Sequence, residues 1–268
     1  MNPRVSEPGI VRDDVLAGSD EVGGVRLEWS AACNVGMVRE ANEDGALIGP
    51  GLFLLADGMG GHECGEVASE VALRVLSGVG VGGDQAGTRD EVEKLLVSAQ
   101  DEIGEIDTSS DRRAGTTATG AILITHDDKP HWLVFNIGDS RTYCVRDGVF
   151  EQVTVDHSQV QEYVDAGMLT VEQARVDPRR NVITRALGAG LVPPRADFFS
   201  FETEPGDQLL LCSDGLSGEL PDEEIGEILA ECATAQDATD TLVESALALG
   251  AHDNVTVVVV RVGPPDDA

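Results

Sequence analysis

Apolar runs separated by glycine-rich turns recur along the chain and predict β-strands. The run Gly51 to Asp57, GLFLLAD, is continuous enough to suggest a strand buried on both faces, and it leads into the turn GMGG. A turn at Asp127 to Pro130 separates two other runs, as in a hairpin. We expect strands over residues 25–33, 51–57, 116–125, 131–137, 141–146, 207–214 and 254–262.

Segments with helical spacing of apolar residues come in pairs. In residues 66–76, Val67, Val71 and Val75 fall at helical spacing and mark an apolar face. Helices are predicted over 66–76 and 91–106, over 221–232 and 236–249, and as two short pieces within 158–176 broken at Gly167. Hairpin-like strands with paired helices differ from the regular alternation of a doubly wound sheet. We therefore expect an α+β fold of mostly antiparallel sheets packed together, with paired helices outside.

The length of 268 residues suits one large domain. Residues 1–23 are polar and acidic without periodicity, which predicts a flexible N-terminal tail. Residues 24–263 are predicted to form the single folded domain, and residues 264–268 a short tail.

Composition narrows the classes of partner. The chain has 49 acidic and 18 basic residues, a net charge of −31, and would repel nucleic-acid backbone and anionic lipid. Its five cysteines include no Cys-x-x-Cys pair, which argues against a disulfide framework or a thiolate zinc site. The sequence has no bilayer-length apolar stretch and no signal-peptide pattern. We expect a cytoplasmic, soluble protein without nucleic-acid or membrane partners.

Four aspartates stand where apolar strands end or begin. Asp57 and Asp214 each follow an apolar run and precede a glycine, Asp139 follows the run ending at Ile137, and Asp253 precedes the last run. If these strands share a sandwich, its mouth gathers several carboxylates, which are costly to bury unless a cation neutralises them. Mg²⁺ and Mn²⁺ prefer oxygen ligands, and two such ions can activate water to hydrolyse a phosphate ester.

The segment from Arg39 to Asp44 supplies the complementary groups. Arg39 can hold phosphate oxygens through its planar fork, while Glu43 and Asp44 can orient metal-bound water. Gly58, after Asp57, would let a backbone carbonyl approach the same ion.

With these residues in view, the chain resembles the metal-dependent protein phosphatases, the type 2C serine/threonine family, in its bacterial single-domain branch. The resemblance rests on eight stretches in the family's order, covering residues 30 to 262: GMVREANED, LLADGMGGHECGEVAS, GTTATGAIL, FNIGDSRTY, TVDHSQVQ, NVITRALG, LLLCSDGLS and HDNVTVVV. It implies a four-layer αββα sandwich in which two mostly antiparallel sheets are flanked by pairs of helices. It also implies hydrolysis of phosphoserine and phosphothreonine on proteins by a water that bridges two divalent metals.

The resemblance further implies a set of metal ligands. Asp57 would bridge two Mn²⁺ or Mg²⁺ ions, the carbonyl of Gly58 would bind one of them, and Asp214 and Asp253 would complete the other. Asp139 would hold a weaker third metal and share Asp214 with it.

The other implied roles concern substrate. Arg39 would bind the phosphate, Glu43 and Asp44 would act through bound water, and residues 158–180 would form a mobile flap beside the site. The implied partners are phosphorylated proteins and a bacterial serine/threonine kinase, and we expect a monomer. Two positions depart from the family: Met59 replaces the histidine of animal members, a role we do not transfer to His62, and Asp177-Pro178 replaces the usual His-Pro of the flap.

Simpler interpretations remain open for single residues. An aspartate before glycine is usually a turn former, Asp139 also suits a hairpin turn, and Asp44 could be a helix cap. Arg39 could pair with Glu40, and Asp156 and His157 could form a turn or brace the site. Two other functions also remain open, a phosphoprotein-binding pseudo-enzyme and a phosphatase for the phosphoserine of an anti-sigma-factor antagonist. The complete ligand set argues against a pseudo-enzyme, and the GDSR and DGMGGH motifs argue against the anti-sigma-factor antagonist phosphatase.

Overall fold

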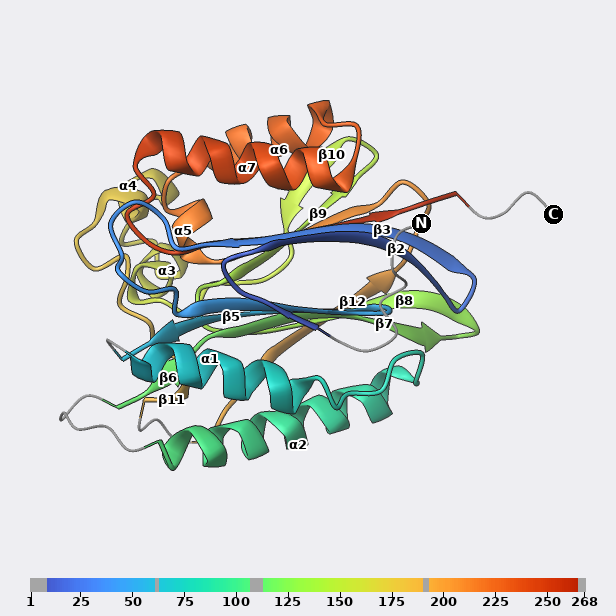
Figure 1. The fold of residues 1–268 in the computed structure, drawn as a ribbon, viewed down its shortest axis with the longest axis horizontal. Coiled ribbons are helices and arrows are strands. Elements are labelled where there is room, and N and C mark those ends of the chain that lie inside the picture. Colours follow the sequence, from blue (N-terminus) through green and yellow to red (C-terminus); the bar gives the residue numbers. More distant parts are fainter. Residues whose placement is uncertain (1–8, 61–62, 107–112, 190–192, 265–268) are drawn as a thin grey trace.

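The computed structural model describes residues 9–60, 63–106, 113–189 and 193–264, and these form a four-layer sandwich (Figure 1). Two β-sheets face each other in the middle, one pair of helices covers the outer face of one sheet, and a second pair covers the other. This architecture confirms the predicted α+β fold with antiparallel sheets and flanking helix pairs.

The first sheet is antiparallel and carries the segment predicted to hold Asp57. Its strands run in the spatial order β1 (Gly9–Val11), β4 (Asp44–Gly49), β5 (Leu52–Met59), β7 (Ala118–His126), β8 (Lys129–Ile137) and β12 (Asp197–Glu202). Two short strands, β6 (Gly115–Thr116) and β11 (Leu187–Gly188), extend it beside the end of β5.

The second sheet is also antiparallel and carries the segments around Asp214 and Asp253. Its spatial order is β10 (Val149–Gln152), β9 (Arg141–Arg146), β13 (Gln208–Cys212), β14 (Val255–Val262), β3 (Val25–Asn34) and β2 (Val15–Val22).

The helices lie outside the sheets or beside their ends. Helices α1 (Glu63–Leu76) and α2 (Gln85–Gly104) cover the first sheet, and α6 (Asp222–Glu231) and α7 (Ala235–Leu249) cover the second (Figure 1). Two short helices, α3 (Gln159–Asp165) and α4 (Val171–Val176), and the single turn α5 (Asp214–Ser217) lie at one end. None of the described helices is long and apolar enough to cross a membrane.

Strand β5 shows why the continuous apolar run is required. Leu52 and Leu54 pack beneath α1 and α2, while Phe53 and Leu55 point into the core between the two sheets. Because successive side chains alternate between the faces of a strand, a strand buried on both faces needs apolar residues at every position. The prediction for residues 51–57 is confirmed, and this packing fixes the position of Asp57 at the strand's end.

The predicted N-terminal tail is wrong for the described part of residues 1–23, because β1 and β2 pair with β4 and β3. The polar, partly exposed pattern of residues 15–22 suits an edge strand, whose outer side faces water. Residues 1–8 lie outside the described ranges, and the domain boundaries stay a prediction.

Two details of the predicted helices also change. Helix α1 buries Ala68, Ala72 and Leu73, while Val71 and Val75 pack against the core only partly buried and Val67 is 41% exposed, so the valines mark the border of the buried face and not its centre. The small alanines let the helix lie close to the sheet. Helix α2 starts earlier than predicted, at Gln85, because the side chain of Asp84 caps it by accepting from the N–H of Gly87.

Candidate active site

The predicted carboxylates meet at one end of the sandwich. Asp44, at the start of β4, lies directly opposite Asp57 of β5. In the second sheet Asp214 follows β13 and Asp253 precedes β14, and these neighbouring antiparallel strands place the end of one beside the start of the other. The hydroxyl of Thr256 on β14 donates to Oδ2 of Asp44 at 2.8 Å, so the two sheets are joined at this end.

Burial and mutual repulsion make the ionised form of these carboxylates unfavourable. Desolvation raises the pKa of Asp57 well above its ordinary value, and the charges of Asp44 and Asp214 raise it further. Desolvation likewise raises the pKa of Asp44 to about 7 and that of Asp214 to about 6. A divalent cation would supply the missing charge.

Asp139 extends this cluster from the turn between β8 and β9. The residue is 6% exposed, and its buried Oδ1 atom has no hydrogen-bond partner in the described structure. Desolvation raises the pKa of Asp139 well above its ordinary value, and the charge of Asp214 adds to the rise. An orphaned carboxylate oxygen beside other carboxylates fits the oxygen-ligand chemistry of Mg²⁺ and Mn²⁺.

Arg39 lies at the rim of the cluster and pairs with one of its members. Its Nη2 donates to Oδ2 of Asp253 at 2.5 Å, so the alternative partner Glu40 is not the one used. Burial lowers the pKa of Arg39, but the negative charges of Asp253, Glu43 and Asp214 outweigh burial and raise it. In the described ranges, no three or more His, Cys, Asp or Glu side chains are arranged closely enough to hold a metal ion.

Gly58 is held beside the cluster by contacts that leave no room for a side chain. Its N–H donates to the carbonyl of Glu43 at 3.1 Å, and a Cβ at this position would collide with the carbonyl oxygens of Gly65 and Glu43. The carboxylate of Glu43 lies against Gly65 in the first turn of α1, where the partial positive charge of a helix N-terminus favours an anion. Glycine at position 58 thus lets β4, β5 and α1 meet next to Asp57.

Two residues that hold the backbone of the candidate site were not recognised from the sequence. The hydroxyl of Thr117 accepts from the N–H of Asp57 at 3.0 Å, and the Thr117 N–H donates to the Asp57 carbonyl at 2.8 Å. Asn254 accepts from the N–H of Glu43 at 2.9 Å and fixes the Arg39 loop by donating to the Ala41 carbonyl at 3.0 Å. These contacts join residues 60 and 211 positions apart, and the only sequence signal was that Asn254 follows a predicted ligand.

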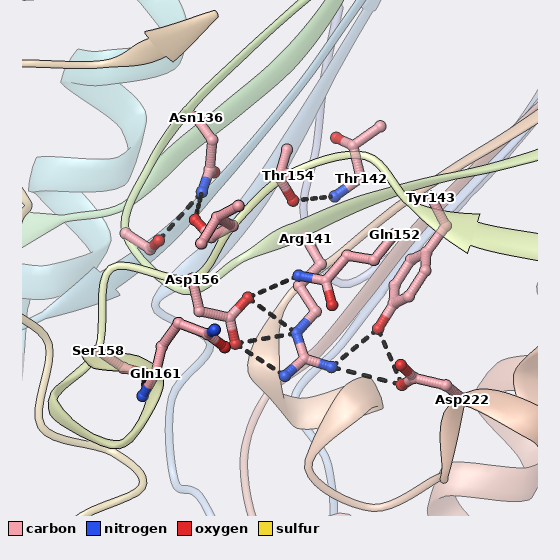
Figure 2. Close-up of polar contacts among 12 residues, drawn as sticks. Asn136, Arg141, Thr142, Tyr143, Gln152, Thr154, Asp156, Ser158, Gln161 and Asp222 are labelled. Carbon is pink, nitrogen blue, oxygen red and sulfur yellow. Dashed lines mark hydrogen bonds and ion pairs between the residues drawn. The ribbon is translucent and has the colours of Figure 1, made fainter. Parts of the chain in front are cut away.

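The turn that carries Asp139 is braced by an ion-pair network (Figure 2). Arg141 donates from Nε to both oxygens of Asp156 at 3.0 Å and from Nη2 at 2.7 Å. Its Nη1 donates to the hydroxyl of Tyr143 at 2.9 Å, and that hydroxyl donates to Asp222 at the start of α6 at 3.1 Å (Figure 2). The network ties β9 to the segment before α3 and to α6.

His157 fixes the same turn from the other side. The backbone N–H of His157 donates to the carbonyl of Gly138 at 2.9 Å, and the ring Nδ1 of His157 accepts from the backbone N–H of Gly138 at 3.0 Å. Nε2 therefore carries the ring proton and donates to Asp197 at 3.1 Å. Of the two interpretations left open for Asp156 and His157, the contacts support the brace.

A cavity of about 440 Å³ opens between the carboxylates and helices α3 and α4. Its lining includes Arg39, three candidate ligands and eight residues of the predicted flap, residues 158–180: Ser158, Val160, Gln161, Val164, Val171, Ala174, Arg175 and Arg180. This volume lies in the range of ligand sites. The position of the flap residues beside the carboxylates agrees with the prediction, while their mobility stays a prediction. His62 lies outside the described residues.

Comparison with known proteins identifies the family. A sequence model described as protein phosphatase 2C matches residues 42–250. The chain is 39% identical over 239 residues to the serine/threonine protein phosphatase PstP of Mycobacterium tuberculosis, covering 88% of this chain and 45% of PstP. It is 36% identical over 238 residues to the serine/threonine phosphatase stp of Listeria monocytogenes, covering 84% of this chain and 92% of stp. The chain thus spans about half the length of PstP and nearly all of stp.

Structural similarity leads to the same family. The solved catalytic domain of PstP, in complex with two manganese ions, superposes with a TM-score of 0.76 at 37% identity, covering 90% of this chain and 99% of that one. The family match includes Glu43, Asp57, Asp139 and Asp214, while Arg39 and Asp253 lie just beyond its two ends. Sequence and structure agree, and the resemblance drawn from the motifs is confirmed: the chain belongs to the protein phosphatase 2C family.

Proposed function

We propose that the chain is a metal-dependent protein serine/threonine phosphatase that hydrolyses phosphoserine and phosphothreonine esters. The observation that carries the proposal is the convergence of Asp44, Asp57, Asp139, Asp214 and Asp253, whose charges act on one another at the mouth of the sandwich. Family membership and relatives named as serine/threonine phosphatases support the same activity.

The residues of this cluster would hold Mn²⁺ or Mg²⁺. Asp57, the carbonyl of Gly58, Asp214 and Asp253 would hold two ions, and Asp139 a weaker third ion together with Asp214. Bound there, divalent cations supply hydroxide at neutral pH and neutralise charge on the phosphoryl group. The two manganese ions of the PstP catalytic domain support the number two for this chain.

The protein's own groups would bind the substrate and orient water. Arg39 is half-exposed at the cavity rim, where its guanidinium fork can reach phosphate oxygens that enter from solvent. Asp44 is held by Thr256 and Glu43 lies against α1, so both side chains are fixed in place to orient water. Phosphate would leave without a covalent enzyme intermediate.

Two thiols are poor nucleophiles in this chain. Desolvation raises the pKa of Cys33 to about 11 and that of Cys212 to about 12. Since the thiolate is the reactive form, these cysteines are unreactive at neutral pH. Cys33 and Cys212 are therefore not suited to form a cysteinyl-phosphate intermediate.

The natural substrates are proposed to be phosphorylated proteins, including a serine/threonine kinase and its targets. The cavity beside the carboxylates is open enough for a phosphorylated side chain on a flexible segment. We further propose that the chain acts in the cytoplasm as a monomer, in keeping with its strong acidity, which disfavours self-association.

Phosphate release from a phosphothreonine peptide, with Mn²⁺ and with EDTA, tests the proposal. We expect activity only with the metal, and its loss in both Asp57→Asn and Asp214→Asn. Asp101→Asn, an exposed residue on α2, is the matched control and should keep wild-type activity. Absence of metal-dependent activity in the wild type, or full activity in either site variant, would disprove the assignment.

A further inference from the structure

Residues 9–22, which we call the N-terminal arm, connect the free edges of both sheets. Strand β1 pairs with β4 at the edge of the first sheet, and β2 pairs with β3 at the edge of the second. The chain crosses from one sheet to the other between Val11 and Val15, as the dark-blue segment in Figure 1 shows. The arm lies outside the family match, which begins at residue 42.

Arg12 lies at this crossing and its side chain is only 15% exposed. Its Nε donates to the carbonyl of Asp44 at 2.8 Å, and its Nη2 donates to the hydroxyl of Ser69 on α1 at 2.8 Å. Its Nη2 also donates to the carbonyl of Glu66 at 3.2 Å. One guanidinium thus joins the start of β4, where a proposed catalytic carboxylate sits, to helix α1.

The hydrogen bonds continue from Ser69 to Gly58, which is proposed to bind metal through its carbonyl. The hydroxyl of Ser69 accepts from Arg12 and donates to the carbonyl of Glu43 at 2.6 Å. The same carbonyl accepts from the N–H of Gly58 at 3.1 Å. Arg12 therefore fixes the backbone of Asp44 directly and that of Glu43 and Gly58 through one hydroxyl.

The next residue of the arm, Asp13, holds the same segment through Asn42. Asp13 accepts from Nδ2 of Asn42 at 2.8 Å, and Oδ1 of Asn42 accepts from the N–H of Asp44 at 3.2 Å. Asp13 has a φ of +53°, a backbone conformation that needs local support. Residues 12 and 13 together thus clamp residues 42–44.

The charge of Arg12 is already compensated by acids of α1. Its Nη1 lies 3.0 Å from Oε1 of Glu66 and 4.0 Å from Oε2 of Glu70. An uncompensated arginine would compete with a cation for the nearby carboxylates. The pairing leaves Arg12 to act through the geometry of its fork, which a lysine does not reproduce.

We propose that Arg12 is a positioning residue for the metal centre: the N-terminal arm holds Asp44, Glu43 and the Asp57–Gly58 step in the arrangement that binds divalent cations. This inference rests on the proposed function, since it assumes that the cation binds at Asp57. The arm also covers two sheet edges, a protective role that would need neither Arg12 nor its contacts with residues 43 and 44.

The test is Mn²⁺ binding to the full-length chain, measured by calorimetry for wild type, Arg12→Met, Arg12→Lys and Ser69→Ala. Arg12→Met is expected to weaken Mn²⁺ affinity about 10-fold, the size of effect seen when groups that orient metal ligands are removed. Arg12→Lys should recover little of it, and Ser69→Ala should shift affinity in the same direction. The double variant Arg12→Met/Ser69→Ala should be no weaker than Arg12→Met, because the two residues act in one chain of hydrogen bonds.

Arg261→Met is the matched control. Arg261 also holds backbone carbonyls, with Nη2 donating to Cys232 at 2.7 Å and Nη1 donating to Ala233, but it lies at the end of β14 remote from Asp253. It should lower the thermal unfolding temperature and leave Mn²⁺ affinity unchanged. With phosphopeptide, Arg12→Met should raise the Mn²⁺ concentration for half-maximal rate about 10-fold and keep kcat at saturating Mn²⁺.

Three outcomes overturn the inference. Wild-type Mn²⁺ affinity in both Arg12→Met and Ser69→Ala would leave the arm a purely structural element. An equal loss of affinity in Arg261→Met would attribute the effect to general destabilisation. Absence of Mn²⁺ binding by the wild type would refute the proposed metal site and with it the inference, and so differs from a failure of the arm alone.

Discussion

Asp44→Asn should make the metal-free protein more stable at pH 8, although it removes a proposed catalytic carboxylate. Asp44 is 1% exposed, and desolvation raises its pKa from 3.8 to about 7, with repulsion from Asp214 and Asp253 adding to the effect. Because this pKa is higher in the folded state than in the unfolded state, the folded protein binds the proton more tightly. The stability that protonated Asp44 contributes to the fold is therefore fully present below pH 3.8 and is lost as the pH rises to about 7.

The expected magnitude follows from the same shift. A pKa raised from 3.8 to about 7 corresponds to about 4 kcal/mol of unfolding free energy lost by pH 8. Asparagine can still accept from Thr256, but its amide group would have to share the Ser213 hydroxyl, which already accepts from the N–H of Thr256 at 3.0 Å, and a poorly satisfied buried amide costs about 2 kcal/mol. The net gain is about 2 kcal/mol at pH 8 and falls to near zero at pH 5, where most of the penalty is already absent.

Denaturant unfolding in EDTA at pH 5 and pH 8 measures both values, with Asp101→Asn on the exposed face of α2 as the control. Added Mn²⁺ should stabilise the wild type more than the variant, because the cation removes the repulsion that the substitution has already relieved. A variant no more stable than the wild type at pH 8, or an advantage that does not change with pH, would refute the electrostatic account of the cluster.

Three further predictions concern the rim, the backbone and the brace of the site. Arg39→Ala should raise the KM for a phosphopeptide about 10-fold, which is the value of a hydrogen bond to a charged group. Calorimetry should show that Mn²⁺ still binds, because the substitution also frees Asp253. An unchanged KM would contradict phosphate binding by Arg39. Gly215→Ala should destabilise the protein by about 2 kcal/mol in denaturant because the new Cβ would meet the Asn254 carbonyl, whereas Gly104→Ala, with open space around it, should not, and equal effects would contradict the steric argument. Asp156→Asn should lower unfolding free energy by about 3 kcal/mol because it leaves Arg141 without its bidentate partner, and an effect below about 1 kcal/mol would show that Asp222 suffices to hold it.

The strands that carry the ligands could be predicted because each is an apolar run that ends in a polar residue. The run Leu52 to Ala56 is buried at every position, so its sequence reports both its secondary structure and its place between a sheet and two helices. Antiparallel pairing then brings Asp214 and Asp253 to one edge, and this follows from the order of strands in a sandwich. The positions of the four strand-end aspartates were predictable for these reasons.

The contacts between the sheets could not be read from the sequence. Thr256 is one of several β-branched residues in its strand, and nothing local shows that its hydroxyl reaches Asp44, 212 positions away. The N-terminal arm was mistaken for a tail because edge strands need few apolar residues, and the polar pattern of residues 15–22 resembles that of a disordered segment. Arg12 gains its role only when the arm has crossed between the sheets.

The acidic partners of the arginines around the carboxylates distinguish arginines that support the structure from the one proposed to bind substrate. Arg12 pairs with Glu66 and Glu70, and Arg141 pairs with Asp156 and Asp222, all acids outside the proposed ligand set. The side chains of Arg12 and Arg141 are both more than two-thirds buried. These neighbouring acids therefore neutralise their positive charges and fix their geometry.

Arg39 differs on both counts, because its side chain is 51% exposed and its partner is Asp253, a proposed ligand. A cation that binds Asp253 would displace this pairing and leave the Arg39 guanidinium available to phosphate at the rim. Metal binding and phosphate binding would then be coupled through Asp253 as well as through the cations themselves, so Mn²⁺ should tighten the binding of inorganic phosphate more in wild type than in Arg39→Ala. Equal tightening in both proteins would show that Arg39 has no part in that coupling.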